Sequence, residues 1–481
     1  MHLDLDGNGT LHAQLTRALK HAVLVRGLAA GTRLPATREL AAELGVSRNT
    51  VVSAYEQLAA EGYIEGHAGS GNYVAALPAP VAATTRPGTK ARAPRLTTCA
   101  RVATAQRANR PPGRSRIPLR YNLEYGLPLV TPALTSMWRR ALARAAEDTD
   151  PDYPPAEGLQ VLRAAIAGYL GRRRGLAVDA QDVIVTAGVQ QAIDLVVRAL
   201  VAPGDGAAIE DPHYQGTRQV LLAAGARLAF VPVDGDGIEV ARLPATRVRL
   251  VCVTPSHQFP RGVVLSLRRR LELLAWASRA DAWIVEDDYD GEFRHDGRPI
   301  AALKSLDRED RVIYAGSFSK VLFPALRLGY LVVPPALREP LRAIKWLADR
   351  GCPAIEQHAL AALVESGRFE RLLRRSGRLL AERRRALLEG LARHAAGLVQ
   401  VEGTSAGMHV AVWLPRHRPA DIATVIAAAQ SAGVGAYPVS PYFSRAPRRA
   451  GLLLGYSGLA ARDLAEGARR LGAVLRETAT A

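Results

Sequence analysis

The chain has 481 residues, of which 48% are hydrophobic, and a formal net charge of +18 at pH 7. This length predicts about two to four domains, and no apolar run is long enough to predict a membrane span or a signal peptide. The positive charge favours a polyanionic partner, nucleic acid first, although part of the arginine excess reflects an Ala/Arg-rich composition. Three widely spaced cysteines predict neither a disulfide framework nor a metal site. We therefore expect a cytoplasmic protein of several domains.

Residues 1–76 have the pattern of a small helical DNA-binding domain. Thr37 is a candidate cap for a helix that ends at Gly45, and Ser47 caps a second helix that ends at Gly62. Two short helices joined in this way are typical of a helix-turn-helix, whose second helix enters the major groove. Two strand-like runs around the sequence HAGS then predict a wing beside the minor groove.

This segment resembles the winged-helix domain of GntR-type bacterial regulators through LPATREL, GVSRNTVVSAYEQL and GHAGSGNYV. The resemblance implies DNA contacts from the two helices and the wing, made by Arg38, Ser47, Arg48, Thr50, His67 and Gly69. A guanidinium is suited to reading guanine at Arg48, whereas Thr50 and Arg38 suit phosphate contacts. The alternative for each arginine is a solvated surface charge.

Residues 77–120 differ in composition from both neighbouring segments. They are rich in Pro, Thr, Ala and Arg, contain no acidic residue and show no apolar period. Such a composition predicts an extended, self-repelling and flexible linker.

Residues 121–479 alternate short β-branched runs with helical segments, which predicts a parallel sheet in an α/β domain. Three segments of this domain place polar groups where strands end. Gly188, Val189 and Gln190 begin a helix after a strand, and such a helix start offers free N–H groups to a phosphate. Asp287 and Tyr289 close a second strand, where α/β sheets hold ligands, although a run of acids is also typical of a solvated strand end.

The third segment reads YAGSFSK and is followed by FPALRLGY. Its Ser317 and Ser319 hydroxyls suit a phosphate, Arg327 follows at a distance that reaches the same group, and Lys320 lies between them. A lysine beside a phosphate cradle and a buried carboxylate is the constellation that pyridoxal 5'-phosphate (PLP) uses. We therefore expect PLP as the cofactor, and no metal.

Residues 121–479 resemble fold-type I aminotransferases, and the whole chain resembles the MocR/GabR branch of GntR regulators, in which such a domain follows a winged helix. The motifs that carry this resemblance are EDPHY, TPSHQFPRG, EDDYDGEF, GSFSK and FPALRLGY. It implies an α/β fold with a winged helix-turn-helix joined by a linker to an aminotransferase-like domain. It also implies a homodimer.

By this resemblance Lys320 forms the Schiff base with PLP, Asp287 pairs with the pyridine nitrogen and Tyr289 bonds the ring hydroxyl. Tyr214 stacks on the ring. The phosphate is surrounded by Gly188, Val189, Gln190, Ser317, Ser319 and Arg327. His257 and Gln258 lie near the ring, with a structural turn as the alternative for both.

The sequence departs from the aminotransferase pattern where the substrate carboxylate is expected. Leu453 occupies the place of an arginine on a late strand, and Arg261 replaces a threonine in the TPSHQFPRG segment. Arg218 is an alternative anion ligand. These departures weaken the case for ordinary transamination but remove no expected cofactor contact.

Three functions fit these observations. The chain is a PLP-dependent transcriptional regulator that senses PLP or an amine or amino-acid effector through aldimine exchange, an active aminotransferase with an appended DNA-binding module, or a regulator without cofactor. We favour the first, because the recognition helix is intact and the carboxylate arginine is replaced. The partners expected are double-stranded promoter DNA and a small effector, with no membrane.

Overall fold

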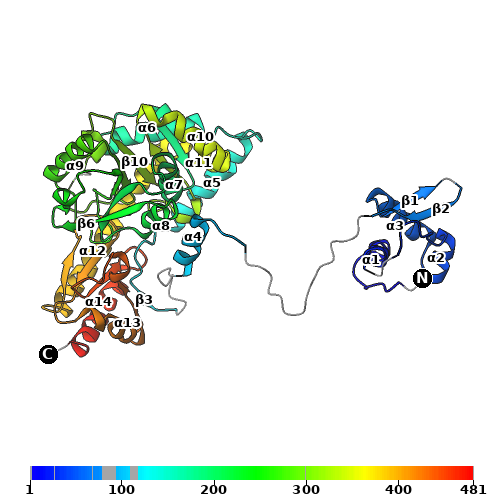
Figure 1. Cartoon of the computed structure of the whole chain (residues 1–481). Coiled ribbons are helices and arrows are strands. Elements are labelled where there is room, and N and C mark those ends of the chain that lie inside the picture. The colour runs from blue at the N-terminus through cyan, green and yellow to red at the C-terminus, as the bar shows by residue number, and fades with distance from the viewer. Residues whose placement is uncertain are drawn as a thin grey trace. The chain divides into compact units, whose positions relative to one another are not determined.

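A computed structural model describes residues 3–25, 28–67, 69–77, 94–108, 118–297 and 300–479. The chain divides into two compact units, residues 1–95 and 96–481. In Figure 1 the smaller unit is drawn in dark blue and the larger in the remaining colours. No helix in the described ranges combines the length and apolar character that crossing a membrane requires.

The smaller unit is a winged helix. Its elements are α1 (Leu11–Leu24), α2 (Thr37–Leu44), α3 (Arg48–Ala60), β1 (Ile64–His67) and β2 (Gly71–Val74). The two strands pair antiparallel, and Leu15, Leu40 and Val51 are fully buried in the core between the helices. The predicted helix boundaries are confirmed except that α2 includes Thr37. Its N-cap is Ala36, whose backbone N–H donates to the Glu39 carboxylate at 3.2 Å.

The prediction of an unstructured linker over 77–120 is wrong for residues 98–108. These residues form α4 (Thr98–Ala108), which packs against α8 (Gln215–Ala223) in the larger unit. The sequence TCARVATAQRA contains several strong helix formers and neither Gly nor Pro, and contact with α8 stabilises a helix that the local pattern does not reveal. Residues 78–93 and 109–117 of the predicted linker lie outside the described residues.

The larger unit is built around a mixed eight-stranded sheet in the order β4-β11-β10-β9-β8-β5-β6-β7. Its strands are β4 (Val183–Thr186), β5 (Gly206–Asp211), β6 (Arg227–Asp234), β7 (Gly237–Ile238), β8 (Val248–Val253), β9 (Trp283–Asp288), β10 (Val312–Ser317) and β11 (Gly329–Val332). The strands from β10 through β6 run parallel, while β11 and β7 are antiparallel to their neighbours. Most of their residues are buried, as expected for strands covered on both faces.

Helices cover both faces of this sheet (Figure 1). They are α5 (Pro132–Asp148), α6 (Gln160–Arg174), α7 (Val189–Leu200), α8, α9 (Leu267–Ala280), α10 (Arg338–Asp349) and α11 (Ala354–Glu365). Side chains of α7 and α10 share one apolar cluster with the sheet, and side chains of α9 share another. Because helices cover both faces, a ligand can reach the sheet at the ends of its strands.

A second subdomain completes the larger unit. Its antiparallel sheet has the order β12-β13-β16-β15, with β12 (Gln400–Glu402), β13 (His409–Trp413), β15 (Tyr437–Pro438) and β16 (Gly451–Gly455). The remaining elements are β3 (Tyr121–Asn122), α12 (Arg368–His394), α13 (Ile422–Ser431), β14 (Val434–Gly435) and α14 (Ala461–Glu477). β3 pairs in parallel with β14, which joins the start of the predicted domain to its end.

Candidate functional site

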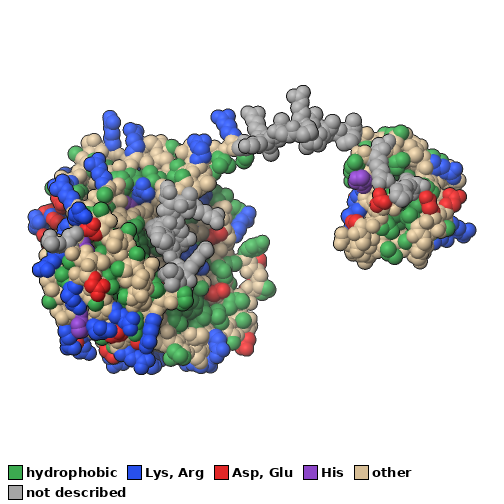
Figure 2. All heavy atoms as spheres, turned by 90° about the horizontal axis from the view of Figure 1, so that it is seen from below, with side chains coloured by type: hydrophobic (Ala, Val, Ile, Leu, Met, Phe, Trp, Pro, Cys, Tyr) green, Lys and Arg blue, Asp and Glu red, His purple; other side chains and the backbone are tan. Residues whose placement is uncertain are grey.

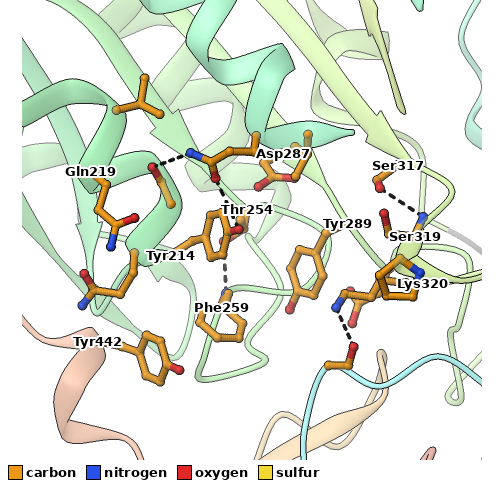
Figure 3. Close-up of a pocket in the computed structure, with 18 of the residues that line it drawn as sticks. Tyr214, Gln219, Thr254, Phe259, Asp287, Tyr289, Ser317, Ser319, Lys320 and Tyr442 are labelled. Carbon is orange, nitrogen blue, oxygen red and sulfur yellow. Dashed lines mark hydrogen bonds between the residues drawn. The ribbon is translucent and has the colours of Figure 1, made fainter. Parts of the chain in front are cut away.

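A cavity of about 820 Å³ lies at the carboxyl ends of the parallel strands, a volume within the usual range for small-molecule sites. Its wall includes Asp287 and Tyr289 at the end of β9, and Ser317, Ser319 and Lys320 at the end of β10 (Figure 3). The register explains the gathering, because β9 and β10 are parallel neighbours with Asp287 opposite Ala315. The predicted strand-end groups thus meet at one edge of the sheet.

Lys320 presents its amine to this cavity. Its Nζ donates a hydrogen bond to the Gly126 carbonyl oxygen at 2.7 Å. Burial lowers the pKa of the Lys320 amine, while Asp290 and Asp287 act in the opposite direction. A lowered pKa increases the fraction of neutral amine, which is the nucleophilic form that reacts with carbonyl groups.

Asp287 is a buried carboxyl group with an unmet bonding requirement. Its side chain lines the cavity, and its Oδ1 atom has no hydrogen-bond partner among the described residues. Burial raises the pKa of Asp287 to about 8, with smaller contributions from Asp288, Asp290 and Glu210. A buried acceptor of this kind is costly unless a donor reaches it. An N–H group on a ligand in the cavity would satisfy it.

Asp288 has the opposite environment from its neighbour. Its Oδ2 atom pairs with Arg174 Nη2 at 2.6 Å and accepts from the Tyr314 hydroxyl at 2.5 Å. Alternation along β9 turns this side chain away from the cavity. Asp288 is therefore a structural residue.

The residues predicted to bind a phosphate meet at the start of α7. Gly188 is the N-cap of α7 with φ 84°, a conformation that favours glycine, and the free N–H groups of a helix start follow it. A Cβ atom at Gly188 would lie 3.2 Å from Arg327 Nη1, so the guanidinium packs directly against this turn. Arg327 Nη2 also donates to the Ala187 carbonyl oxygen at 2.5 Å. Ser317 Oγ accepts from the Ser319 backbone N–H at 3.1 Å.

Three further predicted residues, two in the first turn of α7 and one before α8, also lie at the cavity wall. Val189, Gln190 and Tyr214 line the cavity, and the Tyr214 hydroxyl is 3.5 Å from Gln190 Oε1. Tyr214 meets Phe259 edge to face, with ring centroids 6.1 Å apart. The cavity therefore brings together the predicted phosphate, ring and lysine contacts.

His257 and Gln258 lie behind the wall rather than in it. His257 Nδ1 is 2.9 Å from the Tyr289 hydroxyl and 3.0 Å from Asp290 Oδ2. Gln258 Nε2 donates to the carbonyl oxygens of Pro212 and Phe259 at 2.8 and 2.7 Å. Neither is a lining residue of the described wall, and their expected place near the ring stays a prediction. His257 orients Tyr289, and Gln258 holds the turn.

Arg218, the candidate anion ligand, and Arg261, which replaces a threonine, both have side-chain partners. Arg218 Nη1 is 3.5 Å from Gln106 Oε1 on α4, and Arg261 pairs with both Glu402 carboxylate oxygens at 2.6 and 3.0 Å. Within the described wall neither arginine is a lining residue. Leu453 is fully buried in an apolar cluster with Trp413 and Tyr442.

Sequence reasoning missed several residues of the wall. These are Ala103, Gln106, Tyr125, Gly126, Thr254, Phe259, Met408, His409 and Tyr442. Thr254 follows β8, so the strand-end rule that singled out Asp287 also applies to it. Phe259 lies in the same turn after β8. The others come from α4, from the segment after β3 and from the second subdomain, where the local sequence carries no comparable signal.

The predicted DNA contacts of the smaller unit fall on α2, at the start of α3 and on the wing. Arg38 and Arg48 are exposed, and Gly69 lies in the wing turn with φ 80°. Ser47 caps α3, because its Oγ accepts from the Thr50 N–H at 3.1 Å. Figure 2 also shows Lys and Arg side chains spread over the visible face of the larger unit.

Comparison with known proteins identifies both units. The family model of bacterial regulatory proteins of the gntR family matches residues 11–74, and the model of class I and II aminotransferases matches residues 125–443. The probable rhizopine catabolism regulatory protein MocR of Rhizobium meliloti is 40% identical over 473 residues, covering 98% of this chain and 94% of the relative.

The chain belongs to the MocR-type regulators of the GntR family.

A second MocR-type relative is the pyridoxine biosynthesis transcriptional regulator PdxR of Corynebacterium glutamicum. It is 32% identical over 447 residues, which cover 93% of this chain and 92% of PdxR. Among solved structures, the α-aminoadipate aminotransferase LysN of Thermus thermophilus, in complex with N-(5'-phosphopyridoxyl)-L-leucine, is 31% identical with a TM-score of 0.67. That match covers 74% of this chain and 92% of LysN. The expected fold, a winged helix followed by a fold-type I aminotransferase domain, is confirmed.

Proposed function

We propose that this MocR-type regulator binds duplex DNA through α3 and the wing, holds PLP in the cavity around Lys320, and responds there to a small amine. The observation that carries the cofactor assignment is the unpartnered, buried Asp287 oxygen in the same cavity as the Lys320 amine. The phosphopyridoxyl group bound by LysN and the regulator names of the relatives support the same assignment.

The residues present fit PLP at each of its polar ends. Asp287 would hold the pyridine nitrogen, and its raised pKa would fall once a positively charged donor reaches it. The turn at Gly188, the α7 start, Ser319 and Arg327 would hold the phosphate. When bound, PLP supplies an aldehyde that bonds reversibly and covalently to an amine.

Lys320 takes part in sensing through its amine. An effector amine that takes its place frees Nζ and fills the cavity, so the two states differ in contacts and hence in free energy. The response needs no consumption of the effector. Such an exchange makes the cavity a sensor whose state can be transmitted to the DNA-binding unit.

The domain is aminotransferase-like, and a working aminotransferase is the second candidate. The relatives named as regulators and the burial of Leu453 where an arginine is expected favour a sensor. Steady-state transfer from common amino acids to 2-oxoglutarate separates the two. A catalyst would complete many turnovers per cavity, whereas the proposed sensor would complete fewer than about one per minute, far below ordinary enzymes.

A homodimer is part of the proposal. Large apolar side chains are exposed around the end of α10, with Leu347 72% and Trp346 47% exposed, and Tyr153 is 84% exposed. Gly351 lies against the Pro155 carbonyl, which brings these segments together. Exposed apolar groups of this size favour an interface, and a symmetric dimer would present two winged helices to paired half-sites.

Borohydride reduction tests the cofactor assignment directly. The purified full-length protein is expected to absorb in the visible range, and reduction followed by mass spectrometry should place one pyridoxyl group on Lys320. Lys304 and Lys345 serve as internal controls, because their amines bond to the Val312 carbonyl and to Asp349. A pyridoxyl mass on either of them, with Lys320 unmodified, would contradict the assignment.

A further inference from the structure

We propose, resting on the function above, that the effector is a primary amine whose remainder is uncharged, and not an α-amino acid. The proposal follows from the charges and the chemical groups of the cavity wall. The reacting end of the effector is set by Lys320. The rest of the wall decides which amine is accepted.

The basic side chains of the described wall are Lys320, Arg327 and His409. Lys320 is the group that the effector replaces, and Arg327 packs against the Gly188 turn at the phosphate end. His409 is neutral, because burial lowers its pKa to about 3, with His257 adding to the effect. A carboxylate on the effector would therefore meet no cation in the described wall beyond those assigned to the lysine and phosphate sites.

The acidic side chains of the wall act against a carboxylate. Asp194 and Asp290 line the same cavity, whereas Asp287, with its raised pKa and its assignment to the pyridine nitrogen, adds no free negative charge. Like charges at short range in a partly enclosed site cost several times more than in bulk water. The wall therefore favours an ammonium ion on entry and disfavours a second, negative group.

The groups beside the lysine are aromatic rings with hydroxyls. Lys320 bonds to Gly126, and the adjoining Tyr125 meets Tyr442 edge to face at 6.1 Å, with their hydroxyls hydrogen-bonded to each other. Phe259 packs on Tyr442 at 4.9 Å. Burial raises the pKa of both tyrosines, so their hydroxyls stay uncharged. Leu453 lies behind Tyr442 in the same cluster.

The far part of the wall offers amides. Gln106, Gln215 and Gln219 line it, and Figure 3 shows Tyr214, Phe259 and Tyr289 between Gln219 and Lys320. Amides and phenols donate and accept hydrogen bonds without charge, which suits hydroxyl groups on a ligand. The wall thus fits an amine whose remainder carries rings or hydroxyls.

Matched pairs of amine and amino acid test this class. The PLP-loaded full-length protein is titrated with tyramine and L-tyrosine, with 2-phenylethylamine and L-phenylalanine, and with ethanolamine and L-serine, while its visible absorption is followed. The same titrations of free PLP correct for intrinsic reactivity. After correction each amine is expected to reach half-saturation at a concentration at least tenfold lower than its amino acid.

One result would overturn the inference while leaving the proposed function in place, namely an amino acid that binds as tightly as its amine in every pair. A PLP band at Lys320 that no amine shifts, or failure to find that band, contradicts the proposed function itself, so the two failures are distinguishable.

A charge placed in the wall sharpens the test. Gln219→Arg adds a cation to a half-buried wall position and is expected to reduce the amine preference at least fivefold, whereas Gln219→Met, of similar length, should leave it within about twofold. Leu453→Arg is a second variant at a buried position. An unchanged preference in a folded, PLP-loaded Gln219→Arg protein would contradict the charge argument.

A separate observation concerns α4. Ala103 and Gln106 line the cavity from α4, and Gln106 contacts Arg218 on α8. In the chain α4 follows residues 78–93, which connect it to the winged helix. We infer that an occupant of the cavity contacts α4, and that this helix carries the effect of occupancy towards the DNA-binding unit.

Two exposed alanines of α4 provide a matched pair for this inference. Ala103→Trp places a ring at the cavity mouth and should raise the amine concentration for half-saturation at least tenfold, whereas Ala105→Trp, on the same helix but outside the described wall, should change it less than twofold. Equal effects of the two variants would contradict the contact.

Limited trypsin digestion measures whether α4 becomes more protected when the cavity is occupied. Cleavage after Arg101 in α4 should slow at least fivefold when the tightest-binding amine of the pairs saturates the protein. Arg462, whose side chain is 88% exposed, serves as the internal control and should be cleaved at an unchanged rate. An unchanged rate at Arg101 would contradict transmission through α4.

Discussion

The winged helix and the cavity assemble their binding groups in different ways. The candidate DNA contacts lie between Arg38 and Gly69, on two short helices and the wing, and all but the half-buried Thr50 are exposed. The cavity draws residues from Ala103 to Tyr442, and several of its polar groups are buried with displaced pKa values. Surface charge and salt should therefore govern the first site, and burial and pH the second.

The largest expected effect is a difference in stability between substitutions at the structural Asp288 and at the cavity residue Asp287. Asp288→Asn breaks a buried pair with Arg174 and should lower the free energy of unfolding of the larger unit by about 3–5 kcal/mol. Asp287→Asn should leave it unchanged or raise it at neutral pH, because its Oδ1 has no partner in the described structure and ionisation of the buried carboxyl opposes folding. Tryptophan fluorescence in urea measures this unit alone, since all five tryptophans lie beyond residue 95. Equal losses in both variants would remove the distinction between the two carboxyls.

The second prediction is a pH dependence peculiar to the cavity. The Asp287 pKa of about 8 lies above its unfolded value, so the folded state holds a proton that the unfolded state releases. Stability of the cofactor-free protein should therefore fall as pH rises from about 5 to 8, by up to about 1.4 kcal/mol per pH unit from this group. Asp287→Asn should flatten the profile by that amount. Identical slopes for variant and wild type would show that the carboxyl ionises normally.

The third prediction concerns the exposed site. Arg48→Ala should weaken operator binding by about 1–3 kcal/mol and relax its specificity, whereas Arg38→Ala should lower the salt slope by about one. Arg17→Ala is a control, because that guanidinium already pairs with Asp6 at 2.7 Å. Fluorescence anisotropy at two salt concentrations measures all three. Unchanged affinity in both Arg48→Ala and Arg38→Ala would place the DNA contacts elsewhere.

The smallest effect is on the recognition helix itself. Ser47→Ala removes the cap of α3 and should cost about 1 kcal/mol of local stability. Hydrogen exchange of peptides from α3 should then quicken about fivefold. Ser53→Ala, at an exposed position within α3, should leave exchange unchanged or slower because alanine favours helix. Equal exchange in Ser47→Ala and wild type would mean that the cap does not stabilise the helix.

The same comparison explains what the sequence could predict. Caps and glycine stops are local signals, so the winged helix was predicted nearly to the residue, with Thr37 as the exception. The strand-end rule placed Asp287, Ser317 and Lys320 together, because parallel neighbours end at one edge. Helix α4 and the positions of Tyr125, His409 and Tyr442 depend on tertiary packing between distant segments, which no local pattern records.

His257 and Gln258 show a further limit of sequence reasoning. A turn after β8 brings them close to the cavity, where His257 bonds to the wall residues Tyr289 and Asp290, and Gln258 bonds to the carbonyl oxygens of Pro212 and Phe259. Tyr289, Asp290 and Pro212 lie more than 30 positions away in the chain, so the local sequence could not predict these bonds.

The central claim is that the cavity and the winged helix act as one regulator through Lys320. The most direct measurement is the affinity of the full-length protein for a DNA duplex selected from a random pool, with and without a saturating amine, for wild type and Lys320→Ala. The account predicts that the amine changes the wild-type affinity at least fivefold and leaves Lys320→Ala unchanged, while both proteins bind DNA equally without it. The same response in both proteins, or none in the wild type while it carries PLP on Lys320, would contradict it.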